Sequence, residues 1–247
     1  MSLRSNPPAA ALGVSPDAAT GAGTAPLRIG VFDSGAGGLS VLRAIRARLP
    51  QAELVYAADT GHAPYGDRHE AEIQERTRRV AGFLRERGAQ VVVIACNTAT
   101  TVAVQGLRAA GERLPIVGVE PGIKPAVALS TARRIGVLAT TRTVASEKVR
   151  RLVQDHGSGA TILLQACPGL ANTIESPDAD GAGLAALVER YSAPLREARV
   201  DVAVLGCTHY VFARDLFERA LPGVHFVDTA DAVARQTARL AAEVDAR

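Results

Sequence analysis

Short apolar runs alternate with longer amphipathic stretches from residue 27 almost to the end of the chain. The runs are rich in Val, Ile and Leu, and a length of about four to eight residues is typical of buried strands. They predict strands at residues 27–32, 54–57, 91–95, 116–119, 134–138, 161–165, 202–205 and 225–227.

Helical periodicity occupies the segments between these runs, for example over residues 39–48, 70–87 and 184–196. Strands that alternate with helices predict an α/β fold whose sheets are mainly parallel and flanked by helices. Within the second of these helices, a series of arginines from Arg76 to Arg87 is interleaved with glutamates. Alternating charges of this kind predict the solvated face of one helix.

The first 26 residues differ from the rest, because they are rich in Ala, Pro, Gly and Ser and show neither period. We predict a disordered tail over residues 1–26, with no apolar stretch long enough for a signal peptide. In the whole chain of 247 residues, 47% are hydrophobic and 21% are charged, which is enough to build a core. No apolar run is long enough for a transmembrane helix, so we expect no membrane partner.

Charge and aromatic content argue against nucleic acid as a partner. The 28 basic and 25 acidic residues leave a formal charge of +3, and aromatic residues make up 4% with no Trp. The three cysteines, Cys96, Cys167 and Cys207, form no CxxC pair and predict free thiols in a reducing cytoplasm. Scattered cysteines and histidines without HxxxH or HExxH spacing predict no metal site.

Polar residues follow several of the predicted strands directly. They are Asp33-Ser34 after the first strand, Cys96-Asn97-Thr98 after the third, and Cys207-Thr208-His209 after the seventh. Ligands of parallel α/β sheets bind beyond the carboxyl ends of the strands. The glycine-rich segment after Ser34 lacks the last glycine of the GxGxxG fingerprint, and no Walker A motif is present. We therefore predict a binding site at these strand ends that holds no dinucleotide.

Two of these segments resemble each other. Residues 91–98 and 202–209 both read as a strand that ends in a cysteine and is followed by polar residues. The repeat predicts two similar α/β halves whose thiols, Cys96 and Cys207, face one cleft. A helix N-terminus lowers the pKa of a thiol. Two such thiols on opposite faces of a substrate invert a stereocentre when one removes a proton and the other delivers one. The usual alternative, a buried cysteine that packs as a small hydrophobe, is our interpretation of Cys167.

Six motifs in one order resemble bacterial glutamate racemases, over about residues 29–228. These motifs are Phe32-Asp33-Ser34-Gly35, Ala63-Pro64-Tyr65-Gly66-Asp67, Ala95-Cys96-Asn97-Thr98-Ala99, Gly118-Val119-Glu120-Pro121-Gly122, Cys167-Pro168 followed by Glu175, and Gly206-Cys207-Thr208-His209-Tyr210. The resemblance implies cofactor-independent interconversion of L- and D-glutamate, which supplies D-glutamate for peptidoglycan synthesis. It also implies a homodimer and two α/β domains with the active site in the cleft between them. Residues 27–121 plus 230–247 would form one domain, and residues 122–229 the other.

The resemblance further implies roles for individual residues. Cys96 and Cys207 would be the acid/base pair, assisted by Asp33, His209 and Glu175. The implied substrate contacts are Asp33, Ser34, Tyr65, Gly66, Asn97, Thr98, Thr140, Thr208 and His209. Simpler structural roles remain open: Ser34, Thr98 and Thr208 also suit helix N-caps, Tyr65 suits packing in a turn, and Glu175 suits the surface.

Two other functions fit the same motifs. One is a racemase of aspartate or of another small acid, and the other is a protein-binding inhibitor built on the same fold. The segments Ala63-Pro64-Tyr65-Gly66 and Cys207-Thr208-His209-Tyr210 favour glutamate. The presence of both thiols argues against inhibition as the sole function.

Overall fold

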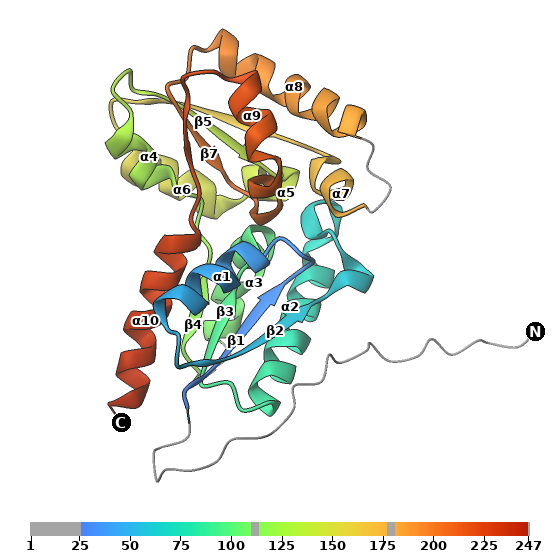
Figure 1. The fold of residues 1–247 in the computed structure, drawn as a ribbon, viewed down its shortest axis with the longest axis vertical. Coiled ribbons are helices and arrows are strands. Elements are labelled where there is room, and N and C mark those ends of the chain that lie inside the picture. Colours follow the sequence, from blue (N-terminus) through green and yellow to red (C-terminus); the bar gives the residue numbers. More distant parts are fainter. Residues whose placement is uncertain (1–25, 110–113, 177–180, 247) are drawn as a thin grey trace, which may run out of the picture.

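The computed structural model describes residues 26–109, 114–176 and 181–246, and it contains two four-stranded sheets (Figure 1). The strands are β1 (Arg28–Asp33), β2 (Glu53–Ala58), β3 (Val91–Ile94), β4 (Ile116–Gly118), β5 (Arg134–Ala139), β6 (Thr161–Ala166), β7 (Val202–Leu205) and β8 (His225–Val227). Every strand pair is parallel, and each strand lies on one of the predicted apolar runs. The predicted fold class is confirmed. The predicted disordered tail, apart from residue 26, lies outside the described residues.

The two sheets have the same strand order. The first runs β2-β1-β3-β4 and the second runs β6-β5-β7-β8, so each places its own first and third strands at the centre. β3 and β7 therefore occupy equivalent positions, which confirms the two similar halves expected from the sequence repeat. Connections leave β1 and β3 toward opposite faces of the first sheet, and residues at such a switch point form a crevice. We refer to β1–β4 with their helices as the first unit, and to β5–β8 with theirs as the second.

Helices cover both faces of the first sheet. They are α1 (Leu39–Arg48), α2 (Glu70–Glu86), α3 (Asn97–Ala109) and α10 (Ala230–Asp245). Val91 and Val93 of β3 pack with α1 and α10, whereas Val92 and Ile94 pack with α2 and α3. Successive strand residues point to opposite faces, so a strand covered on both sides is apolar throughout. This is why β3 reads as an unbroken apolar run.

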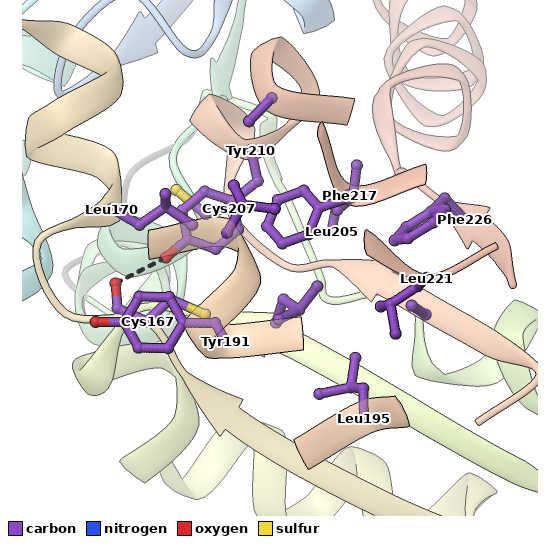
Figure 2. Close-up of a cluster of buried hydrophobic side chains, with 14 of the residues drawn as sticks. Cys167, Leu170, Tyr191, Leu195, Leu205, Cys207, Tyr210, Phe217, Leu221 and Phe226 are labelled. Atoms are coloured by element: carbon purple, nitrogen blue, oxygen red, sulfur yellow. Dashed lines mark hydrogen bonds between the residues drawn. The ribbon is translucent and has the colours of Figure 1, made fainter. Parts of the chain in front are cut away.

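The second sheet is covered in the same way. Its helices are α4 (Ile123–Leu129), α5 (Thr141–Ala145), α6 (Glu147–His156), α7 (Leu170–Glu175), α8 (Gly181–Glu197) and α9 (Arg214–Ala220). One face packs on α4 and α6, and the other packs on α8 and α9 through the cluster in Figure 2. Tyr210, Phe217 and Phe226 pack ring against ring at tilted angles in that cluster, which also contains Cys207. None of the helices in the described ranges is long and apolar enough to cross a membrane.

The chain passes between the units twice. It leaves the first unit after β4 and returns after β8, so that α10 packs against α1 (Figure 1). A methyl group placed on Gly122 would lie 3.1 Å from Val227 Cγ1 and 3.2 Å from Thr229 Cγ2. The two crossing segments therefore lie side by side. The domain boundaries at residues 121/122 and 229/230 stay a prediction.

One arginine of α2 departs from the predicted solvated face. Arg78 and Arg79 are exposed and pair with Glu75, as expected. Arg76 instead turns inward, where its Nε and Nη2 donate to Asp59 Oδ2 and Oδ1 at 2.9 and 2.5 Å. Asp59 is 8% exposed, and a buried carboxylate requires a paired charge. The prediction is wrong for Arg76 because its partner, the loop after β2, is remote in sequence.

Candidate active site

Asp33 lies at the carboxyl end of β1 and is fully buried. Its Oδ1 accepts a hydrogen bond from Gly35 N at 2.7 Å, and its Oδ2 accepts one from Thr208 Oγ1 of the second unit at 3.1 Å. Burial raises the pKa of Asp33 to about 6, although the nearby His209 and these hydrogen bonds oppose the rise. A carboxyl group with this pKa exchanges protons near neutral pH.

Cys96 lies between the end of β3 and the start of α3, and it is 5% exposed. Its Sγ is 3.5 Å from Ser34 Oγ and accepts a hydrogen bond from Ala99 N, also at 3.5 Å. Ser34 comes from the loop after β1, which neighbours β3 in the sheet. The parallel register therefore brings the first and third strand ends together, as the sequence predicts.

Cys207 follows β7 and precedes the short helix η3 (Thr208–Ala213). Its Sγ is 3.8 Å from Nδ1 of His209, and the Nε2 of His209 is hydrogen-bonded to the Glu175 carboxylate at the end of α7. That carboxylate also accepts from Ala36 N of the first unit, at 2.9 and 3.3 Å for its two oxygens. Glu175 is thus not a free surface carboxylate, because it joins His209 to the loop after β1.

The remaining predicted contacts lie along the same interface between the units. Thr98 Oγ1 at the start of α3 is 3.0 Å from Thr140 Oγ1 after β5. Thr140 is also the N-cap of α5, since it accepts from Thr143 N. Gly66 lies close to Thr140, and a methyl group placed on it would be 3.1 Å from Thr140 Cβ. The structure therefore brings predicted residues of both units together.

The Tyr65 hydroxyl points to a partner within the first unit. Tyr65 is 1% exposed, packs against Phe32, and donates its hydroxyl to Asp59 Oδ2 at 2.6 Å. The Tyr65 hydroxyl is therefore already bonded within the first unit. Its assignment as a substrate contact stays a prediction.

The two units touch closely at the loop after β1. A methyl group on Gly37 would lie 2.6 Å from Thr208 Oγ1 and 2.7 Å from His209 Nδ1, and one on Gly35 would lie 2.5 Å from Glu175 Oε1. Contacts this short mean that a side chain at either position would displace Glu175, Thr208 or His209. Glycines here allow the backbone of one unit to reach the polar side chains of the other.

Both interface thiols are more basic than the sequence suggests. Burial raises the pKa of Cys96 to about 11 and raises that of Cys207 well above its usual range, and the charge of Asp33 adds to both effects. The predicted lowering by a helix N-terminus is therefore wrong for this closed arrangement. The hydrogen bond from Ala99 N does favour the Cys96 thiolate, but loss of water outweighs it. Both groups are neutral thiols at pH 7 in this state.

Asn97 carries a buried polar atom that no described residue contacts with a hydrogen bond. The residue is 3% exposed, and its Oδ1 accepts no hydrogen bond from the part of the chain that the structure describes. A buried acceptor left empty is costly, and a ligand that brings a donor removes the cost. The acceptor directly follows Cys96, where the ammonium group of an amino acid would supply donors. Among the described residues, no group of three His, Cys, Asp or Glu side chains is arranged to hold a metal ion.

Sequence reasoning missed two residues of this region. Tyr56 of β2 donates its hydroxyl to Gly35 O at 2.7 Å, in the loop that follows Asp33. Asp59 holds Tyr65 and Arg76, as described above. The sequence signal for Asp59 was its position two residues after a predicted strand, whereas Tyr56 lies inside an apolar strand and gave none.

Comparison with known proteins agrees with this geometry. The family model described as Asp/Glu/Hydantoin racemase matches residues 38–237. The chain belongs to this racemase family. The match covers most of both units, including both thiols at the interface.

Relatives with assigned names point to one member of the family. The glutamate racemase of Methylococcus capsulatus is 49% identical over 212 residues, which cover 85% of this chain and 78% of that protein. The glutamate racemase of Pseudomonas paraeruginosa is 47% identical over 213 residues, or 86% of this chain and 80% of that protein. A crystal structure of Escherichia coli glutamate racemase, in complex with L-glutamate and the activator UDP-MurNAc-Ala, has 34% identity and a TM-score of 0.80. It covers 88% of this chain and 83% of that chain.

Proposed function

We propose that this racemase interconverts L- and D-glutamate by proton transfer between Cys96 and Cys207, without a cofactor, and so supplies D-glutamate for peptidoglycan synthesis. The observation that carries the proposal is the duplicated architecture, in which each thiol follows the third strand of its sheet at the same distance. The names of relatives at 47% and 49% identity support glutamate as the substrate, as does L-glutamate in the E. coli structure.

The two thiols have different surroundings, which gives each a route for its proton. Asp33 and Ser34 lie beside Cys96, whereas His209 and Glu175 serve Cys207. One thiolate removes the Cα proton from one face of glutamate, and the other thiol protonates the opposite face. Each turnover converts the first group to a thiol and the second to a thiolate, and the neighbouring acids and bases restore the starting state.

The substrate itself assists the formation of a thiolate. The pKa values of Cys96 and Asp33 are about 11 and about 6. Transfer of a proton from that thiol to that carboxylate is therefore unfavourable without a further charge nearby. The ammonium group of a bound amino acid places a positive charge beside the thiols and lowers their pKa values. We place the ammonium against Asn97 Oδ1, which accepts no hydrogen bond from the described residues.

The first experiment follows L-glutamate in D₂O, with chelator present and without pyridoxal phosphate. Loss of optical rotation should accompany loss of the Cα proton signal, because the delivered proton comes from solvent. Cys96→Ala and Cys207→Ala should each abolish racemisation, since inversion requires both faces. Cys167→Ala is the matched control, because that thiol lies in the core cluster of the second unit and donates to Gln165 O.

The alternatives give different results in the same assay. Preference for aspartate would transfer the assignment to a racemase of another acid. Absence of activity with both acids, together with tight binding of a protein partner by the Cys96→Ala, Cys207→Ala double variant, would support the alternative function as a protein-binding inhibitor. Full activity in either single variant would defeat the two-thiol mechanism. The homodimer and the cytoplasmic location belong to this proposal and rest on the family resemblance; light scattering tests the former.

A further inference from the structure

The peptide group between Gly35 and Ala36 is hydrogen-bonded at one end to Tyr56 and at the other end to Glu175. The Tyr56 hydroxyl donates to Gly35 O at 2.7 Å. The N–H of the same peptide group belongs to Ala36 and donates to Glu175 Oε1 at 2.9 Å. A peptide group is planar, so fixing its carbonyl also fixes the direction of its N–H. One peptide of the first unit is therefore oriented by Tyr56 and presented to a carboxylate of the second.

The contacts continue from this peptide to only one of the two thiols. Glu175 is hydrogen-bonded to His209 Nε2, and His209 Nδ1 is 3.8 Å from Cys207 Sγ. Cys96 lies outside the series, because its Sγ contacts Ser34 Oγ and Ala99 N. Hydrogen bonds in a series polarise one another, and each strengthens its neighbours by roughly 10–30%.

Tyr56 acts here as a donor and not as an acid. Burial raises the pKa of its hydroxyl far above the usual range, and the charges of Asp33 and Glu175 add to the rise. The hydroxyl therefore keeps its proton at every pH at which the enzyme is folded. It contacts the Gly35 carbonyl rather than any group proposed to exchange protons with substrate.

We propose that Tyr56 is a positioning residue for the Cys207 half of the racemase reaction, acting through the Gly35–Ala36 peptide, Glu175 and His209. The inference rests on the proposed function. It predicts an asymmetry: loss of the Tyr56 hydroxyl slows proton transfer at Cys207 and leaves proton transfer at Cys96 unaffected.

The test uses Tyr56→Phe, which removes the hydroxyl and keeps the ring. We expect kcat/KM to fall about tenfold, as for the loss of one buried hydrogen bond. The fall is equal in both directions, because L- and D-glutamate have equal free energies. Tyr191→Phe is the matched control, since the Tyr191 hydroxyl also donates to a backbone carbonyl, that of Pro168, at 2.6 Å.

Isotope effects separate positioning from a general structural loss. With glutamate deuterated at Cα, slower transfer at Cys207 raises the isotope effect on kcat/KM for the enantiomer that Cys207 deprotonates. It lowers the effect for the other enantiomer, because reprotonation by Cys207 then limits the rate. Tyr56→Phe should therefore move the two isotope effects in opposite directions, and in the same sense as His209→Gln, which changes the neighbour of Cys207 directly.

Several outcomes overturn the inference. An unchanged kcat/KM, a fall with unchanged isotope effects, or a shift opposite to that of His209→Gln would each contradict it. A fall of the same size in Tyr191→Phe, with the same isotope pattern, would show that the effect is not specific to the Gly35–Ala36 peptide. A wild-type enzyme that is silent toward both enantiomers overturns the proposed function, and the role of Tyr56 in proton transfer falls with it.

Discussion

The replacement Asp33→Asn should stabilise the fold while it removes activity. Asp33 is fully buried, and its pKa is raised from 3.8 to about 6. The folded protein therefore binds this proton more tightly than the unfolded chain, so stability from this group falls as pH rises between about 4 and 6. Asparagine carries no charge and still offers an oxygen to Gly35 N, which donates to Asp33 Oδ1 at 2.7 Å.

The size of the effect follows from the pKa shift. A shift of about two units corresponds to about 3 kcal/mol of unfolding free energy once the group is ionised in both states. We expect Asp33→Asn to exceed the wild type by about 3 kcal/mol at pH 7.5 and by only about 0.6 kcal/mol at pH 4. Racemisation should be lost at pH 7.5, because Asp33 is the proposed proton partner of Cys96.

Urea unfolding at the two pH values measures this difference, with circular dichroism as the signal and racemisation assayed on the same preparations. Asp155→Asn removes one exposed carboxylate from α6 and is the control for the loss of a single charge. An equal gain in stability at both pH values would refute the argument from burial. So would a variant less stable than the wild type at pH 7.5.

Three further predictions test other parts of the structure. Arg76→Ala should lower the unfolding free energy by about 3 kcal/mol or more in urea at pH 7.5, because it removes the arginine that pairs with the buried Asp59 carboxylate. A loss below about 1 kcal/mol, as for exposed pairs, would contradict this. Gly37→Ala should lower kcat/KM at least about tenfold, because its methyl group would lie 2.6 Å from a side chain of the other unit. The control is Gly106→Ala, since Gly106 is exposed and has open space around it, and this variant should keep the wild-type kcat/KM. Iodoacetamide should modify Cys96 in the folded protein at pH 7.5 about a hundredfold more slowly than in the urea-unfolded chain, since a pKa of about 11 instead of 9.0 lowers the thiolate fraction. Peptide mass spectrometry measures both rates. Equal rates would show that the thiol is not held buried.

The strands were predictable because burial on both faces leaves a direct record in the sequence. Each apolar run matches a strand, and the repeat around Cys96 and Cys207 correctly indicated two halves with one strand order. Helix α1 was predicted at both ends, whereas α8 begins three residues before the predicted start. Local patterns determine these features, so one sequence is enough to find them.

Contacts between distant residues were not predictable in the same way. Ala36 and Glu175, which share a hydrogen bond, are 139 positions apart in the sequence, and Arg76 and Asp59 are 17 positions apart. The pKa of Cys96 was predicted with the wrong sign, because a helix start is visible in the sequence whereas the degree of burial is not. Motifs indicated which residues meet, but the hydrogen bonds among them required the fold.

The position of α10 also affects how the protein emerges during synthesis. Val233 and Ala234 complete the core of the first unit beside Val41 and Ile45 of α1. The ribosome therefore releases β1–β4 long before the helix that covers them, while the whole second sheet is made in between. Domains fold as units from the N-terminus onward when they can. Here all strands of the second unit are made before α10. The part of α1 that α10 covers therefore stays exposed to chaperones or to aggregation until α10 leaves the ribosome.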